Sequence, residues 1–206
     1  MDEVLGSEVG GRYTLTGLLR CRKCQEPVAV GGSAYISEPE PLGYSFERGA
    51  EYGSRTTEYT IRFVNPAPPL VKVPTECPVS VGELIKSAFA LYFLDPEAAV
   101  NRLRTAVEVL LTELGILEPH NGRPSLHARI GKLKGMSVPA ERQLADRLEA
   151  VKWLGNAASH ASTLKEEDAL DAFELLESVL HDRFVPEGRT AKGIAQSVNK
   201  KKGPRS

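Results

Sequence analysis

A proline-rich break divides this sequence into two halves that have different residue patterns. Between about Asn65 and Pro78 the chain carries prolines at positions 66, 68, 69, 74 and 78. Proline has no backbone N–H and a fixed φ, so a segment this rich in it continues neither a helix nor a sheet ladder. We therefore predict a linker or arm here, with separate structures before and after it.

Residues 1–78 read as a small β-rich module. The segment is rich in Gly, Pro, Tyr and Thr, and its apolar and polar residues alternate in short runs. The clearest runs are Tyr13–Thr16, Val28–Val30 and Tyr59–Val64. Alternation of this kind, interrupted by turn residues, predicts short strands.

Residues 79–185 read as a bundle of about five helices, because apolar residues recur at spacings of three and four. The predicted helices cover 81–93, 96–114, a segment capped by Ser125 and ended by Gly135, 139–159, and a last helix. That last helix begins with Thr163 and Glu166 in capping-box spacing. Its predicted inward residues are Leu170, Phe173, Leu176, Leu180 and Phe184. The predicted fold class is α+β, mainly α.

Residues 186–206 form a basic tail with six basic residues and one acidic residue. A run such as Lys200–Lys202 can contact phosphates without specificity, but it is more often a solvated terminus. We predict a disordered tail.

Composition excludes several classes. With 206 residues, 41% hydrophobic and 26% charged, the chain reads as globular. No apolar stretch could span a membrane and the first residues resemble no secretory signal, so we expect a cytoplasmic protein. There is no Walker or Rossmann glycine loop, no Gly-x-Ser-x-Gly and no His-Glu-x-x-His.

The helix over 139–159 has a second face that its core stripe does not use. Trp153, Asn156 and His160 lie on this face, opposite Leu144 and its neighbours. An exposed Trp is typical of a surface that meets a partner, and we expect a homodimer through this face. The residues from Gly155 to Ser162 are small apart from the Asn and His, so another backbone can approach closely. A tight helix crossing with satisfied polar groups explains the same pattern.

Arg104 and Glu108 lie one turn apart at the margin of another apolar stripe. They can form a surface ion pair of little energetic value. Alternatively, Glu108 orients His160 and Arg104 offers a cation to a phosphate.

These motifs resemble a known family. Arg104–Glu108, the leucine-rich helix and Trp153–His160 together look like the bacterial domain of unknown function 4145, over about 78–184. That family is usually grouped with the HEPN superfamily of helical bundles, many of which are metal-independent RNases in prokaryotic defence and toxin systems. It also tends to carry an upstream Cys-x-x-Cys segment, as Cys21 and Cys24 provide here.

The resemblance implies a site made by both subunits of a dimer. In active HEPN RNases the motif is Arg, a polar residue, three residues and then His. Here His160 takes the His place and Asn156 the polar place, but Gly155 stands where the motif has Arg. Glycine cannot supply the cation, and Arg104 is a better substitute than Lys152, whose side chain leans away from His160.

The cysteines suggest half of a zinc site. The Cys21-x-x-Cys24 spacing suits two thiolates on one tetrahedral ion. The remaining cysteine is Cys77, and all four histidines fall in the helical part. A closed site needs Cys77 with an unusual ligand or sharing between subunits. A degenerate zinc ribbon without metal is the alternative, and no cofactor is required by the rest of the chain.

Three functions stay open. The first is a HEPN-like dimerisation module, without catalysis, that associates with RNA or another nucleic acid in a bacterial defence or restriction-type system. The second is a metal-independent endoribonuclease that uses His160 with Asn156, Glu108 and Arg104. The third is an adaptor whose N-terminal module binds a protein partner.

Overall fold

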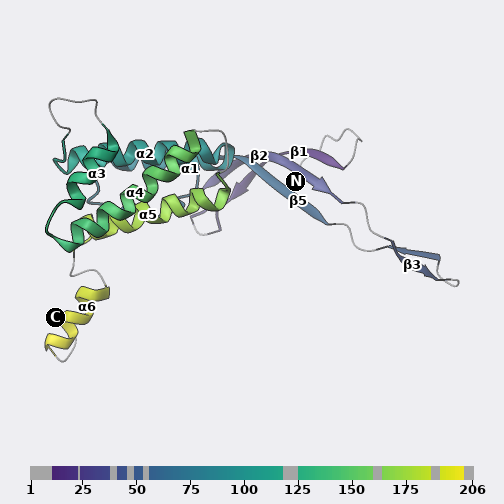
Figure 1. Cartoon of the computed structure of the whole chain (residues 1–206). Coiled ribbons are helices and arrows are strands. Elements are labelled where there is room, and N and C mark those ends of the chain that lie inside the picture. Colours follow the sequence, from purple (N-terminus) through teal and green to yellow (C-terminus); the bar gives the residue numbers. More distant parts are fainter. Residues whose placement is uncertain are drawn as a thin grey trace. The chain divides into compact units, whose positions relative to one another are not determined.

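The computed structural model divides the chain into two units, Met1–Pro68 and Pro69–Ser206 (Figure 1). It describes residues 11–22, 24–37, 41–45, 49–52, 56–117, 125–159, 164–186 and 191–201. The division falls inside the predicted proline-rich linker.

The first unit is built on an antiparallel sheet of three strands. These are β1 (Arg12–Arg20), β2 (Pro27–Ile36) and β5 (Thr57–Asn65), in the order β1-β2-β5. The three alternating runs of the sequence lie within these strands, so their prediction is confirmed. A separate hairpin of β3 (Pro41–Ser45) and β4 (Gly49–Tyr52) was not predicted.

The second unit is a helical bundle, which confirms the α+β, mainly α fold class. Its helices are α1 (Val79–Leu94), α2 (Pro96–Glu113), α3 (Leu126–Lys134), α4 (Pro139–Ser159) and α5 (Glu166–Phe184). Helix α2 packs against α1, α4 and α5, and α4 also packs against α3 and α5 (Figure 1). Helix α2 accordingly contributes seven apolar residues to the core.

Capping residues define the ends of α2 and α3, and the predicted cap Ser125 is confirmed. Asp95 accepts a hydrogen bond from the backbone N–H of Ala98 at 2.9 Å, and Pro96 opens α2. Gly115, at φ +72°, follows the end of α2. Ser125 caps α3 by accepting from the N–H of Ala128 at 3.0 Å.

The start and burial of α5 differ from the prediction. The helix begins at Glu166 and not at Thr163, which lies outside the described residues. The N–H of Lys165 donates to the carboxylate of Asp168 at 2.8 Å, so an acidic side chain three residues on satisfies the helix entrance. Leu170, predicted to face inward, is 40% exposed because it lies at the edge of the apolar stripe.

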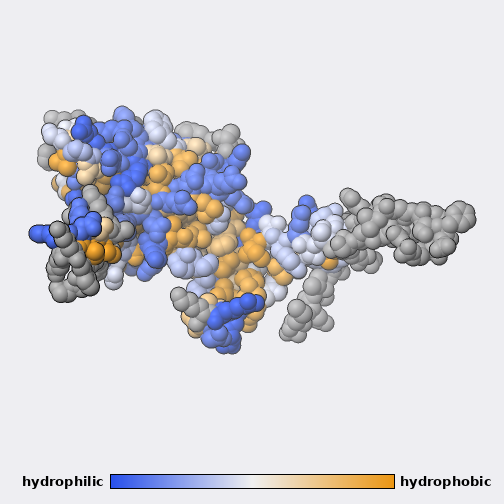
Figure 2. Space-filling model, turned by 90° about the horizontal axis from the view of Figure 1, so that it is seen from below, coloured by the Kyte–Doolittle hydropathy of each residue, from blue (hydrophilic) through white to orange (hydrophobic). Residues whose placement is uncertain are grey.

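Apolar side chains also remain on the surface of the bundle. Figure 2 shows orange hydrophobic residues between blue hydrophilic ones across the visible face. In the described part of the bundle, the exposed large apolar side chains include Val79, Leu94, Trp153 and Leu170. Within the described part of the chain, no helix is long and apolar enough to cross a membrane.

The basic tail contains a helix, α6 (Ala191–Lys201), where the sequence predicts disorder. The physical reason is a short apolar repeat, with Ile194 and Val198 one turn apart, that the lysine-rich composition obscures. Both side chains are exposed in the structure.

Candidate functional site

The crossing of α2 over α4 brings Arg104 against Gly155. A Cβ atom placed on Gly155 would lie 2.9 Å from Cδ, 3.0 Å from Cβ and 3.4 Å from Cγ of Arg104. Real Cβ contacts are longer than this, so only glycine admits the arginine stem here. The small-residue run therefore permits a close approach as predicted, but what approaches Gly155 is the side chain of Arg104.

The guanidinium of Arg104 is fixed by two polar partners. Its Nη1 donates to Oδ1 of Asn156 at 2.8 Å, and its Nε lies 3.7 Å from Oε1 of Glu108. The side chains of Arg104 and Glu108 are 33% and 45% exposed, so the ion pair itself adds little stability. Three of the four predicted catalytic residues thus meet at one place on the surface.

Beside this group, the end of α4 contacts α2 through a second polar pair. Ser159 Oγ lies 2.9 Å from Oδ1 of Asn101 and 2.9 Å from the carbonyl oxygen of Gly155. Because the hydroxyl has one proton, it donates to one of these acceptors at a time. The seam between the two helices is therefore polar at its outer edge.

The fourth predicted residue, His160, lies outside the described residues. It follows Ser159 directly, and the described part of α4 ends at that serine. The predicted orientation of His160 by Glu108 stays a prediction, and the partner that Glu108 has in the structure is Arg104.

Comparison with protein families decides the assignment. The model of the domain of unknown function DUF4145 matches residues 86–201, which is more than half of the chain. The chain belongs to the DUF4145 family. No curated protein and no solved structure matches the chain. The DUF4145 domain covers most of α1, all of α2–α5 and helix α6, and it contains the whole Arg104–Gly155–Asn156 group.

A second polar cluster in the DUF4145 domain surrounds Lys152. This side chain is only 5% exposed, and its Nζ lies 3.2 Å from Nδ1 of His127 and 3.5 Å from Oε1 of Glu149. The same ammonium lies 3.8 Å from the ring centroid of Trp153, which is a cation–π contact. The Lys152 ammonium is therefore engaged by His127, Glu149 and Trp153, and its predicted direction away from His160 stays a prediction.

Trp153 is 57% exposed on the DUF4145 domain, so the structure places it on the second face of α4 as predicted. Asn156, half-buried, lies on the same helix near Trp153. The sequence did not predict the contact of Lys152 with Trp153 and His127. The adjacency of Lys152 and Trp153 in the sequence could have indicated their contact. His127 lies on α3, and no sequence spacing relates it to this pair.

Glu149 connects this cluster to the exposed Lys134. The hydrogen bond from Lys134 is the largest influence on the pKa of Glu149 and lowers it. Desolvation is the next largest influence and acts in the opposite direction, but the net pKa is lowered. The bonds to Glu149 and Asp146 in turn raise the pKa of Lys134. Both groups are therefore charged near neutral pH and form a surface network between α3 and α4.

The cysteine pair lies at the turn between β1 and β2. The backbone N–H of Cys21 donates to the carbonyl of Glu26 at 3.0 Å, which closes the turn, and Cys24 is exposed. Within the described ranges no group of three or more metal-ligating side chains comes together. These residues do not by themselves provide a closed zinc site.

Cys77 belongs to the other unit and is buried. Burial raises the pKa of its thiol, and its Sγ contacts the carbonyl of Pro78 at 3.7 Å. The role of Cys77 as a third zinc ligand stays a prediction.

Thiol labelling tests these environments. With a maleimide or iodoacetamide reagent at pH 7.5, we expect Cys24 to react at least about tenfold faster than Cys77, because the thiolate is the nucleophile and the raised pKa keeps Cys77 protonated. The difference should narrow as pH rises toward the pKa of Cys77. Mass spectrometry of the labelled peptides measures both rates, and a Cys77 as reactive as Cys24 at pH 7.5 would contradict the buried-thiol environment.

Proposed function

We propose that the DUF4145 domain of this chain is a HEPN-like, non-catalytic dimerisation module that binds nucleic acid within a bacterial defence or restriction-type system. In this proposal Arg104 supplies the cation that Gly155 lacks. The dimer forms through the face of Trp153, Asn156 and His160.

The observation that supports this proposal is the packing of Arg104 over Gly155. The arginine stem passes within 3.0 Å of the Cβ position of Gly155, and the guanidinium donates to Asn156. A glycine at the motif's Arg position is therefore compensated by an arginine from α2. A guanidinium has five N–H donors, so bonds to Asn156 and Glu108 leave donors for a phosphate.

The partial exposure of Arg104 favours binding over catalysis. At 33% exposure the guanidinium can meet a phosphate from solvent. The facing carboxylate of Glu108 at 3.7 Å weakens its field, and this suits reversible association better than strong stabilisation of a transition state.

Affinity for RNA tests the role of Arg104. Arg104→Gln is expected to weaken binding of a fluorescein-labelled single-stranded RNA of 20 nucleotides about tenfold, because a charge-assisted phosphate contact is lost. Arg102→Gln is the matched control, since Arg102 is exposed on the same helix and its substitution removes the same charge. Fluorescence anisotropy at fixed salt measures both. If the two variants lower RNA affinity equally, the proposed role of Arg104 is contradicted.

One observation also favours the RNase as a second candidate. Arg104 is placed beside Asn156, so the chain holds a cation next to the motif's polar position. In such a reaction His160 removes the proton of an RNA 2'-hydroxyl, whose oxygen attacks the adjacent phosphorus. The bond from phosphorus to the 5'-oxygen then breaks, the protonated His160 returns its proton to that oxygen, and Arg104 faces the charge of the phosphorane.

Incubation with RNA in EDTA separates the two candidates. We expect the wild-type dimer, verified by light scattering, to leave a labelled RNA intact. Cleavage by the wild type that disappears in a dimeric His160→Ala variant would establish the RNase instead.

We further propose that the β1–β2 turn is a degenerate zinc ribbon. The support is the position of the Cys21-x-x-Cys24 pair at a tight turn between two antiparallel strands. Zinc content of the purified full chain, measured by elemental analysis, is expected to be well below one ion per chain.

A further inference from the structure

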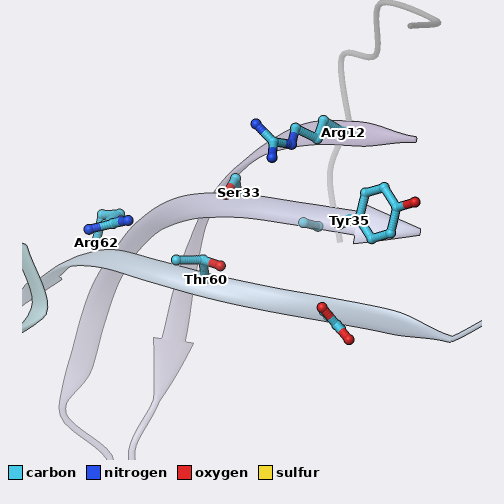
Figure 3. A pocket seen from close by; sticks show the side chains of 7 residues that line it. Arg12, Ser33, Tyr35, Thr60 and Arg62 are labelled. Carbon is cyan, nitrogen blue, oxygen red and sulfur yellow. The ribbon is translucent and has the colours of Figure 1, made fainter. Parts of the chain in front are cut away.

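The three-stranded sheet of the first unit carries a polar hollow on one face. Figure 3 shows Arg12 on β1, Ser33 and Tyr35 on β2, and Thr60 and Arg62 on β5 around it. Glu58 and Ala34 complete the lining, and the hollow has a volume of about 380 Å³. This is room for a nucleotide or two.

The strand register places these side chains together. Arg12 pairs with Tyr35, and Tyr35 pairs with Glu58 across the other edge of β2. Ser33 pairs with Thr60 in the same way. Residues paired in register share a face, so the alternation of the strands directs this set to one side.

The second arginine of this face lies two residues after Thr60 on β5. Residues two apart on a strand share a face, and both Thr60 and Arg62 line the hollow. The register of β2 and β5 shifts between Gly31 and Gly32, which leaves Arg62 without a directly paired residue on β2. Val64 is buried on the opposite face of the sheet, where it pairs with Val30.

The charges of this face are available to a ligand. In the described part of the chain, neither Arg12 nor Arg62 forms an ion pair or hydrogen bond with another side chain. They lie on the two edge strands, and Arg62 is also offset by about four residues along the sheet from the row of Arg12, Tyr35 and Glu58, so their Cα atoms are about 15 Å apart. Two guanidinium groups at this separation suit an extended polyanion that has several phosphates better than one small anion.

Aromatic rings lie at both ends of this surface. Tyr35 is 45% exposed at one end, and the half-exposed Phe63, paired with Gly31, follows Arg62 at the other. Exposed rings on a sheet with basic side chains between them stack unpaired bases, whereas paired bases within a duplex are not accessible to them. An acidic peptide would use the arginines but would leave the rings without a role.

We propose that this face, defined by Arg12, Ser33, Tyr35, Thr60 and Arg62, binds single-stranded nucleic acid. The arginines hold the phosphates and Tyr35 stacks a base. Glu58, opposite Tyr35, accepts from the amino group of that base, which favours cytosine over uracil. The proposal goes beyond the helical site, and it rests on the proposed function only in naming nucleic acid as the ligand class.

Binding by the full chain tests this surface. Twelve-nucleotide probes of cytidine, uridine and deoxycytidine are titrated by fluorescence anisotropy at 50–200 mM salt. The Arg12→Gln/Arg62→Gln variant is expected to bind the cytidine probe at least about tenfold more weakly, with the salt slope reduced by about two. Tyr35→Ala should weaken it about fivefold or more. The matched control is Arg102→Gln/Arg142→Gln, which removes the same charge from exposed helix positions.

Each outcome decides the proposal. Support requires a larger loss in the sheet variant than in the control, with unchanged circular dichroism, and a preference for cytidine over uridine that Glu58→Gln removes. Equal losses of affinity in the sheet variant and the control overturn the proposal, as does a sheet variant with wild-type affinity.

If only Arg104→Gln weakens binding, the helical site alone binds nucleic acid. If polyglutamate displaces the labelled probe as effectively as unlabelled RNA does, the proposal is overturned in favour of an acidic protein partner. The deoxycytidine probe tells RNA from DNA, and either ligand supports the proposal.

Discussion

Arg129→Met is expected to lower the free energy of unfolding by about 2–4 kcal/mol, because the guanidinium connects α3 to the segment that follows α2. Arg129 is only 5% exposed. Its Nε donates to the carbonyl of Ile116 at 2.8 Å, and its Nη2 donates to Oγ1 of Thr112 at 2.8 Å. Methionine fills part of the space but leaves the buried Ile116 carbonyl without its charged donor.

Lys132 provides the matched control one turn along α3. Its Nζ also donates to a loop carbonyl, that of Leu117 at 2.6 Å, but the contact is exposed to solvent. Lys132→Met should therefore change the unfolding free energy by less than about 1 kcal/mol. Urea denaturation followed by circular dichroism gives both values. Equal stabilities of the two variants would show that the Arg129 contacts contribute no more than exposed ones.

Local signals explain why most of the fold could be predicted from the sequence. The stripe of Leu144, Leu148 and Val151 on α4 is buried as predicted, because the helix period appears directly as the spacing of apolar residues in the sequence. Helix caps such as Asp95 act over three residues, so they can be predicted from the local sequence equally well. Thr163 misled the prediction because two capping-box candidates overlap, and the acidic Asp168 completes the one that begins at Lys165.

The candidate site could be predicted only in part, since its chemistry depends on contacts between helices. The residues Arg104, Glu108 and Asn156 were identified, and the structure brings them together. The function of Gly155 in admitting Arg104 was not, because no spacing in one helix reveals which side chain of another helix will lie over it. The nucleotide-sized hollow on the sheet was missed for the same reason, as its residues come from three strands.

Gly155→Leu is expected to lower the free energy of unfolding by about 1–3 kcal/mol, because its side chain must displace the stem of Arg104 from the α2–α4 crossing. Gly155→Ala separates two opposing effects. Alanine gains about 1 kcal/mol of helix propensity, but its Cβ meets the Cδ and Cβ of Arg104 at 2.9 and 3.0 Å. We expect the steric effect to win in the wild-type background.

A double-mutant cycle shows whether Arg104 is the cause. In an Arg104→Ala background the Cγ and Cδ atoms are gone and only the Cβ contact at 3.0 Å remains, so Gly155→Ala should destabilise the protein less than it does in the wild-type background. The coupling between the two substitutions should lie at about 0.5–3 kcal/mol. Thermal and urea unfolding of the four proteins measure it. Additive effects, with no coupling, would mean that Gly155 is kept for helix approach in general and not for this arginine.

The same cycle connects stability to the proposed binding. If Arg104 contacts phosphate from its place over Gly155, then Gly155→Ala moves the guanidinium from Asn156 and should weaken RNA binding as Arg104→Gln does. In the Arg104→Gln background the added methyl group should then have no further effect on affinity. A Gly155→Ala protein that is destabilised but binds RNA with wild-type affinity would separate the packing of Arg104 from its proposed contact with phosphate.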